Sequence, residues 1–270
     1  MALSQSKRQA AVRKELSSVI RQEEKLHKAA MKESSAVWKD KLESLIPGKV
    51  STGLDSAFCK AFSLVFDQGR GIIEKSYKKD AIVEDHAIRD YAVQVKGSRR
   101  ELRKLSRSAR RADFLNLTVT TLEGIGLGAL GIGMPDIVLF ISTLLKGVYE
   151  TALHYGCGYE TRGQQLLILK MLAASLSTGE DWARRNREVE AILTWEEIPV
   201  TEEEFKMQLQ ETASVFSMDM LLLKFIQGLP VVGILGGAMN PVYYSRIMKY
   251  VQLKFRKRYL LRMKETMELV

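Results

Sequence analysis

The sequence predicts an all-α fold, a multi-helix bundle with two glycine-rich apolar helical segments. Leucine, lysine, glutamate, alanine and arginine dominate the 270 residues, and alternating strand-like runs are scarce. Only five prolines occur, and none precedes Pro47. The 46% hydrophobic and 27% charged content is typical of a folded chain that can bury a substantial core.

The first half of the chain divides into charged and amphipathic helices. Residues 5–45 are predicted to form one long or two consecutive charged helices, so we separate a charged N-terminal region, 1–45, from a helical domain over 46–270. Ser51 or Thr52 can cap the next helix, which ends at Gly69. A further helical stretch is expected from about residue 80 to residue 111.

Capping signals predict the later helices. Pro135 and Asp136 suit the first turn of a helix that Gly156 ends. Thr201 and Glu204 have the spacing of a capping box and predict another helix start. The remaining expected helices lie around residues 162–176, around 181–195, and from about 241 onward.

Two glycine-rich apolar segments allow three interpretations. Residues 124–133 contain the G-x-G-x-x-G spacing of a dinucleotide-binding loop, but no βαβ unit surrounds them. Residues 225–245 are uncharged over a membrane-spanning length, although their prolines and amides suit a bent or shallowly inserted segment better. Small residues at spacings of three and four favour close helix packing. The packing or membrane-contact candidates are Gly126, Gly128, Gly131, Pro230, Gly233, Gly236 and Asn240.

The helix expected after Pro135 carries one polar stripe, here called the polar seam. At about 100° per residue, Asp136, Thr143, Glu150 and His154 fall on one narrow face of an otherwise apolar helix. Capping explains Asp136, and Glu150 with His154 lacks the further ligands that a metal site needs. We expect no metal and no cofactor, and a hydrolase-like enzyme that uses the seam stays an alternative.

The charge of the chain favours anionic partners. The net charge is +9, from 41 basic and 32 acidic residues, which suits an anionic membrane surface or a nucleic acid. Residues 96–111 hold eight basic residues against Glu101, as either a solvated helix face or an anion-binding surface. Without interleaved aromatic residues or a recognised motif, a nucleic acid ranks below a membrane as the partner.

The C-terminal helix is the segment for which we predict membrane contact. Its apolar residues repeat at spacings of three and four from Tyr244 to Tyr259, and no acid intervenes between Arg246 and Lys264. The alternative is that the apolar stripe packs in the core and the basic residues are solvated. The predicted anionic-surface contacts are Arg246, Lys249, Lys254, Arg256, Lys257 and Arg258.

Two segments together resemble the motifs of the bacterial EcsC family. They are GIGLGALGIGMPDIVLFISTLLKGVYETALHYG and GLPVVGILGGAMNPVYYSRIMKY, and the likeness extends over residues 35–264. Besides the seven packing or membrane-contact candidates named above, it carries over Pro135, Asp136, Tyr155 and Gly156 as motif positions, but no catalytic residue. The family's namesake is encoded beside the subunits of an ABC transporter, so the resemblance implies a membrane-linked role and a transporter as a candidate partner.

These observations predict a cytoplasmic protein associated with the inner face of the membrane. The N-terminus, MALSQSKRQAAVRKE, lacks the apolar core of a signal peptide. Cys59 and Cys157 match no metal or redox spacing and are expected to be reduced. A soluble helical scaffold or adaptor is the main alternative, and the sequence leaves the biochemical activity and the oligomeric state open.

Overall fold

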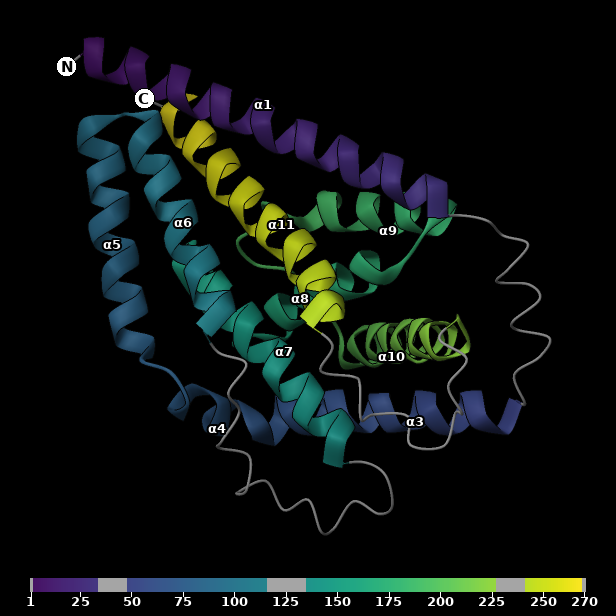
Figure 1. The fold of residues 1–270 in the computed structure, drawn as a ribbon. Helices are drawn as coiled ribbons and strands as arrows, with labels where there is room; N and C mark the ends of the chain where they lie inside the picture. Colours follow the sequence, from purple (N-terminus) through teal and green to yellow (C-terminus); the bar gives the residue numbers. More distant parts are fainter. Residues whose placement is uncertain (1, 34–47, 116–134, 227–240, 269–270) are drawn as a thin grey trace.

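The computed structural model describes residues 2–33, 48–115, 135–226 and 241–268, with side chains over slightly narrower ranges. Every element in these ranges is helical, which confirms the predicted all-α bundle (Figure 1). The helices are α1 (Ala2–Glu33), α3 (Gly48–Leu64), the π-helical turn η1 (Val65–Gly69), α4 (Arg70–Lys75), α5 (Lys79–Lys96), α6 (Arg99–Leu115), α7 (Pro135–His154), α8 (Arg162–Leu176), α9 (Gly179–Ile192), α10 (Glu202–Ile226) and α11 (Pro241–Glu268).

Side-chain caps begin two of the later helices. Before α10, Thr201 Oγ1 accepts a hydrogen bond from the Glu204 amide at 3.1 Å, and Glu204 Oε2 accepts one from the Thr201 amide at 2.8 Å. This is the predicted capping box. Thr161 and Gln164 form a second reciprocal pair at the start of α8. Both pairs satisfy amide groups that the first helical turn leaves without partners.

Three predicted helix boundaries are wrong. Ser51 and Thr52 do not cap the second helix of the fold, because α3 already begins at Gly48. Gly69 does not end its helix, because it is the last residue of η1 and the chain continues helically through α4. The stretch predicted over residues 80–111 is two helices, because Gly97 adopts a left-handed conformation with φ of 55°. Its amide caps α5 by donating to the Val93 carbonyl. The chain reverses there, and α5 and α6 form a hairpin (Figure 1).

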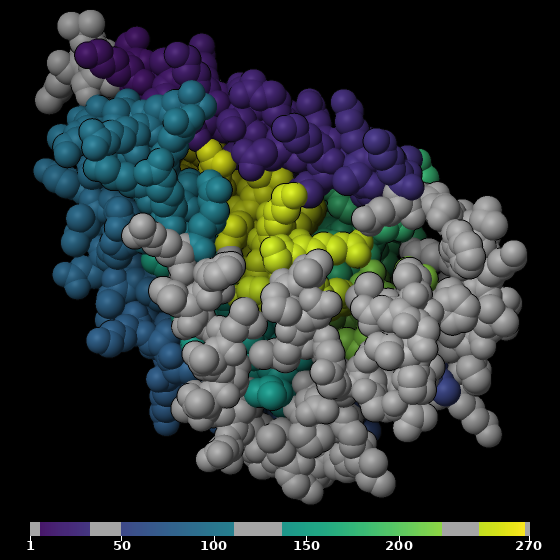
Figure 2. All heavy atoms as spheres, in the orientation of Figure 1, coloured from purple at the N-terminus to yellow at the C-terminus, as the bar shows by residue number. Residues whose placement is uncertain are grey.

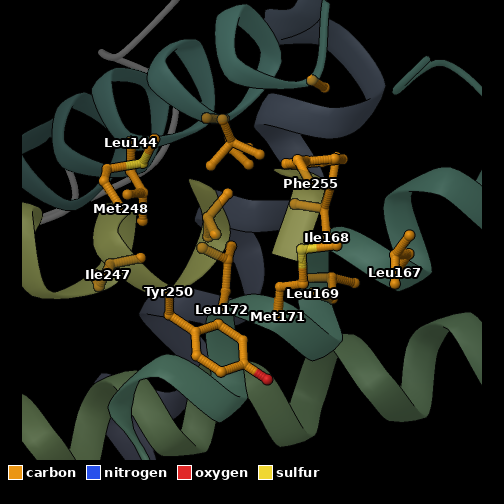
Figure 3. Packing of buried hydrophobic residues seen from close by; sticks show 14 of the residues in the cluster. Leu144, Leu167, Ile168, Leu169, Met171, Leu172, Ile247, Met248, Tyr250 and Phe255 are labelled. Carbon is orange, nitrogen blue, oxygen red and sulfur yellow. The ribbon is translucent and has the colours of Figure 1, made fainter. Parts of the chain in front are cut away.

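Helices α7, α8 and α11 supply much of the core. Figure 3 shows Leu144 of α7, Leu172 of α8 and Met248 and Phe255 of α11 pointing into one apolar cluster. Around them, α1 packs on α11, α6 and α9, the α5–α6 hairpin packs on α7, and α3 packs on α10. The basic helix α11 is therefore an interior element.

Helix α7 is apolar because it is surrounded by protein. Within the described ranges it is the one helix long and apolar enough to cross a membrane, yet 94% of the window Ile137–His154 is buried inside the fold. At Gly147 a Cβ would clash with the hydroxyl of Tyr244 on α11, so α7 and α11 approach closely at a small residue.

Candidate functional site: a cationic face on α1 and α6

The apolar stripe of α11 packs in the core. Its five residues are each at most 8% exposed, and Met248 and Phe255 lie inside the cluster drawn in Figure 3. This is the alternative that the sequence left open for the stripe. The stripe consists of Tyr244, Met248, Val251, Phe255 and Tyr259.

The basic residues of α11 lie mostly inside the fold, which corrects the predicted membrane contact for them. Lys254 is 0% exposed and contacts the carboxylates of Glu23 on α1 and Glu190 on α9. Lys257 Nζ lies 2.6 Å from Glu23 Oε2 and 2.7 Å from Glu190 Oε2. Such partners are required because a protein interior cannot solvate an isolated ammonium group.

The other four predicted contacts of α11 differ in exposure. Arg256 is buried against Glu15 of α1, and Arg258 is buried and donates to the Trp195 carbonyl at 2.7 Å. Arg246 is partly exposed, with its Nη1 3.6 Å from an oxygen of Asp219. Lys249 is exposed. Little of the predicted cationic surface of this helix therefore faces solvent.

Two carboxylates of α1, the buried Glu15 and the partly buried Glu23, hold cations of α11 and α6. Burial by itself would raise the pKa of Glu23, but the charge of Lys254 and hydrogen bonds from both lysines outweigh it and lower that pKa to about 2. Burial likewise opposes ionisation of Glu15, and nearby guanidinium groups lower its pKa. Both acids are charged at neutral pH. The partners of Glu15 are Arg99, Arg103 and Arg256.

The polar seam of α7 does not form one site among the described side chains. The Thr143 hydroxyl donates to a carbonyl of its own helix at 2.9 Å, and Glu150 is buried. His154 faces α5 instead, with its Nδ1 3.9 Å from Asp85 Oδ2. Burial lowers the pKa of His154 although the charge of Asp85 opposes this. The side chain of Asp136 lies outside the described part, and no three metal-ligating side chains group together in the rest.

The motif positions divide between described and undescribed residues. Pro135 is the first residue of α7, as predicted. Tyr155 is buried, and Gly156 takes a φ of 66° at a point where a Cβ would clash with the ring of His86. Glycine is required there for both reasons. The positions outside the described residues are Gly126, Gly128, Gly131, Pro230, Gly233, Gly236 and Asn240.

Helix α6 turns its basic side chains toward solvent. Its exposed arginines follow one another at spacings of three and four, so they share one side of the helix. The one acid of residues 99–110, Glu101, is buried, with an oxygen 3.0 Å from Lys104 Nζ. The exposed arginines are Arg100, Arg103, Arg107 and Arg110.

Helix α1 extends this surface. Apart from Arg13, the exposed basic residues of α1 are spaced by seven, four and three positions and form a stripe on the side away from the core. The contacts of Glu15 with α6 hold the two helices together, and they adjoin in Figure 2. Glu24 is the exposed acid among residues 6–32. The cationic face comprises Lys7, Lys14, Arg21, Lys25, Lys28 and Lys32 of α1 and Arg100, Arg103, Arg107 and Arg110 of α6.

An apolar row on α5 was missed by the sequence reasoning. Ile88, Tyr91 and Val95 are 62%, 69% and 55% exposed. Their spacing could have indicated an apolar stripe, but the same spacing is typical of a face that packs in the core. The packing of α5 shows that this row is exposed and not a core face, because the opposite side of the helix, with Val93 at 0% exposed, packs in the core.

The fold and this surface define an all-α protein with an exposed cationic face. The model of the EcsC protein family matches residues 10–260, nearly the whole chain, and the chain therefore belongs to that family. No curated protein matches the chain, and no solved structure does. The matched region begins inside α1 and includes both Glu15 and Glu23.

Proposed function

We propose that this EcsC-family protein is a peripheral membrane protein that binds an anionic lipid surface through its cationic face. The separation of charge on α1 and α6 carries the proposal. Over residues 6–22 and 99–110 the acids are Glu15 and Glu101, and both are buried, whereas most of the basic residues are exposed and the rest are partly exposed. A surface of one sign attracts a surface of the other, and each basic residue near an anionic leaflet contributes about 1 kcal/mol.

The proposal places the protein at the cytoplasmic face of the membrane, where anionic lipids attract basic surfaces. An ABC transporter, the partner that the family resemblance implies, would be met at that same surface. Helix α7 stays in the protein core in this arrangement, because attachment uses side chains that already face solvent.

Vesicle co-sedimentation tests the proposal. The protein should bind vesicles of phosphatidylglycerol mixed with phosphatidylcholine, should not bind phosphatidylcholine alone, and should dissociate in part at high salt. The combined change Lys14→Gln, Arg100→Gln and Arg107→Gln should weaken this binding by about two orders of magnitude. The fold should tolerate these changes, since all three side chains are exposed.

A control removes the same charge elsewhere. Lys60→Gln, Lys206→Gln and Lys249→Gln alter exposed residues of α3, α10 and α11 and should reduce binding far less. If both triple variants lost the same amount of vesicle binding, binding would depend on net charge alone, and the cationic face would not be a specific binding surface. Binding to duplex DNA but not to anionic vesicles would assign the cationic face to nucleic acid instead.

A further inference from the structure

The outer side of α5 exposes large apolar side chains. Eight large apolar side chains are exposed in the described part of the chain, and four of them are on α5. Ile88, Tyr91 and Val95 follow at spacings of three and four and form one row, here called the α5 stripe. Single exposed apolar residues are ordinary, but a row of three on one helix marks an interaction surface.

The α5 stripe runs beside the basic residues of α6. Gly97 reverses the chain, and Ser108 Oγ donates to Asp85 Oδ2 at 2.8 Å. This register brings residues 88–95 alongside residues 98–105. The two helices lie side by side (Figure 1) and both pack on α7, while the stripe and the α6 part of the cationic face are exposed. The two surfaces therefore belong to the solvent side of the same hairpin.

We propose that the α5 stripe inserts into the anionic membrane at the boundary between headgroups and acyl chains; this inference rests on the proposed function. A cationic face alone also suits nucleic acid, and an apolar row alone also suits a protein groove. An apolar row level with arginines matches the two layers of a bilayer, acyl chains and anionic headgroups. Tyr91 suits that depth because its ring is apolar and its hydroxyl can stay hydrated.

Charges along α5 give the orientation of the inserted hairpin. Asp80 and Glu84 are exposed near the start of α5, whereas Lys96 is exposed at its end, next to the turn. The exposed Lys75 and Lys78 balance this pair of acids, whereas no exposed acid of the described residues balances Lys96 and Arg100 beside the turn. An anionic surface therefore attracts the turn more than the start of α5, and the turn lies deeper. Arg8 of α1 donates to the Gln94 carbonyl at 3.5 Å, which brings the beginning of α1 to the same level.

An environment-sensitive fluorophore on α5 tests insertion directly. The label is attached to Tyr91→Cys in a Cys59→Ser background, where the native Cys157 is buried. Met207→Cys on α10 is the matched control, because Met207 is 62% exposed and lies on a different helix. With phosphatidylglycerol vesicles, we expect a blue shift and quenching by acyl-brominated lipid at position 91, and neither at position 207.

The outcomes separate this inference from the proposed function. Vesicle binding with an unshifted label at position 91 would overturn insertion and leave electrostatic attachment standing. A failure to bind anionic vesicles would overturn both.

A second variant avoids the label. Ile88→Ser, Tyr91→Ser and Val95→Ser together should weaken the binding that remains at high salt by at least about tenfold, while Met207→Ser should not. Circular dichroism would verify that both variants are folded. A wild-type dimer that the triple change converts to a monomer would assign the stripe to a second copy of the chain and overturn insertion.

Discussion

Helices α6 and α11 are both rich in basic residues, but they place their charges in opposite environments. Arg100 and Arg107 of α6 are exposed, whereas Lys254 of α11 is enclosed by carboxylates. Neither stretch has many acids of its own: residues 99–110 have one and residues 246–264 have none. The difference comes from α1 and α9, because Glu15 and Glu23 of α1 and Glu190 of α9 contact the cations of α11. A basic helix predicts an anionic partner, and that partner can belong to the same chain.

Removing Lys254, the buried cation at the centre of α11, should have the largest effect of the changes that test this difference. Lys254→Met keeps the length of the side chain but leaves Glu23 and Glu190 with Lys257 as their remaining shared cation. Breaking a buried ion pair costs about 3 to 5 kcal/mol, and Lys257 should keep the loss near the lower value. Urea denaturation at neutral pH would measure it.

Lys249→Met is the matched control, because Lys249 is an exposed lysine of the same helix. The free energy of unfolding should change by less than about 0.5 kcal/mol. Equal losses in the two variants would show that the burial of Lys254 has no energetic consequence in solution.

Acid should destabilise the contact between α1 and α11. The pKa of Glu23 is about 2 in the folded protein against a reference value of 4.5, so its stabilisation is complete above pH 4.5 and is lost as the pH falls toward 2. A lowering of that size corresponds to about 3 kcal/mol. The lowered pKa of Glu15 acts in the same direction. Urea denaturation midpoints measured between pH 6 and pH 3 would show the loss. In the Glu23→Gln variant the midpoint should depend less steeply on pH. If the midpoint of Glu23→Gln depended on pH as steeply as that of the wild type, Glu23 would not be the group whose protonation destabilises the fold.

The hairpin turn offers a smaller effect. Gly97 has a φ of 55°, so Gly97→Ala should cost about 1 to 2 kcal/mol in thermal unfolding. Gly71→Ala is a suitable reference, because a Cβ at Gly71 meets no atom within 4 Å. If Gly97→Ala and Gly71→Ala changed the thermal stability equally, the left-handed conformation at Gly97 would not be needed for the turn between α5 and α6.

The fold class and several helix ends were predictable because their causes are local. Helix-favouring composition, the capping box at Thr201 and the first turn at Pro135 depend on neighbouring residues. Gly97 also gave a local turn signal, since a serine follows it. The basic residues of 96–111, which include this position, nevertheless suggested one continuous helix. Residues 124–133 and 227–240, which hold the glycines of the two apolar segments, lie outside the described residues, so their predicted packing stays a prediction.

The candidate site was less predictable because its causes are distant in sequence. Glu23 and Lys254 are 231 positions apart, and no local pattern indicates which acid a lysine will meet. The polar seam was placed on the right helix, yet α5 decides the environment of His154 through Asp85. Exposure of the α5 stripe likewise depends on which side of α5 packs on α7. The sequence indicates the charge run over residues 96–111, and packing shows that it faces solvent.

The last prediction involves the smallest change in stability and gives the most direct comparison between the basic residues of α6 and α11. Arg107→Gln removes one exposed charge from α6, so the free energy of unfolding should change by less than about 0.5 kcal/mol. Its affinity for anionic vesicles should still fall by about fivefold, the effect of about 1 kcal/mol near the surface. Lys249→Gln should alter neither quantity as much, although it removes the same charge from α11. Together with the loss expected for Lys254→Met, this would show that stability depends on the buried basic residues of α11 and vesicle binding on the exposed ones of α6. Urea denaturation and co-sedimentation of both variants would check this, and a large loss of stability in Arg107→Gln would mean that α6 holds its arginines in the fold as α11 does.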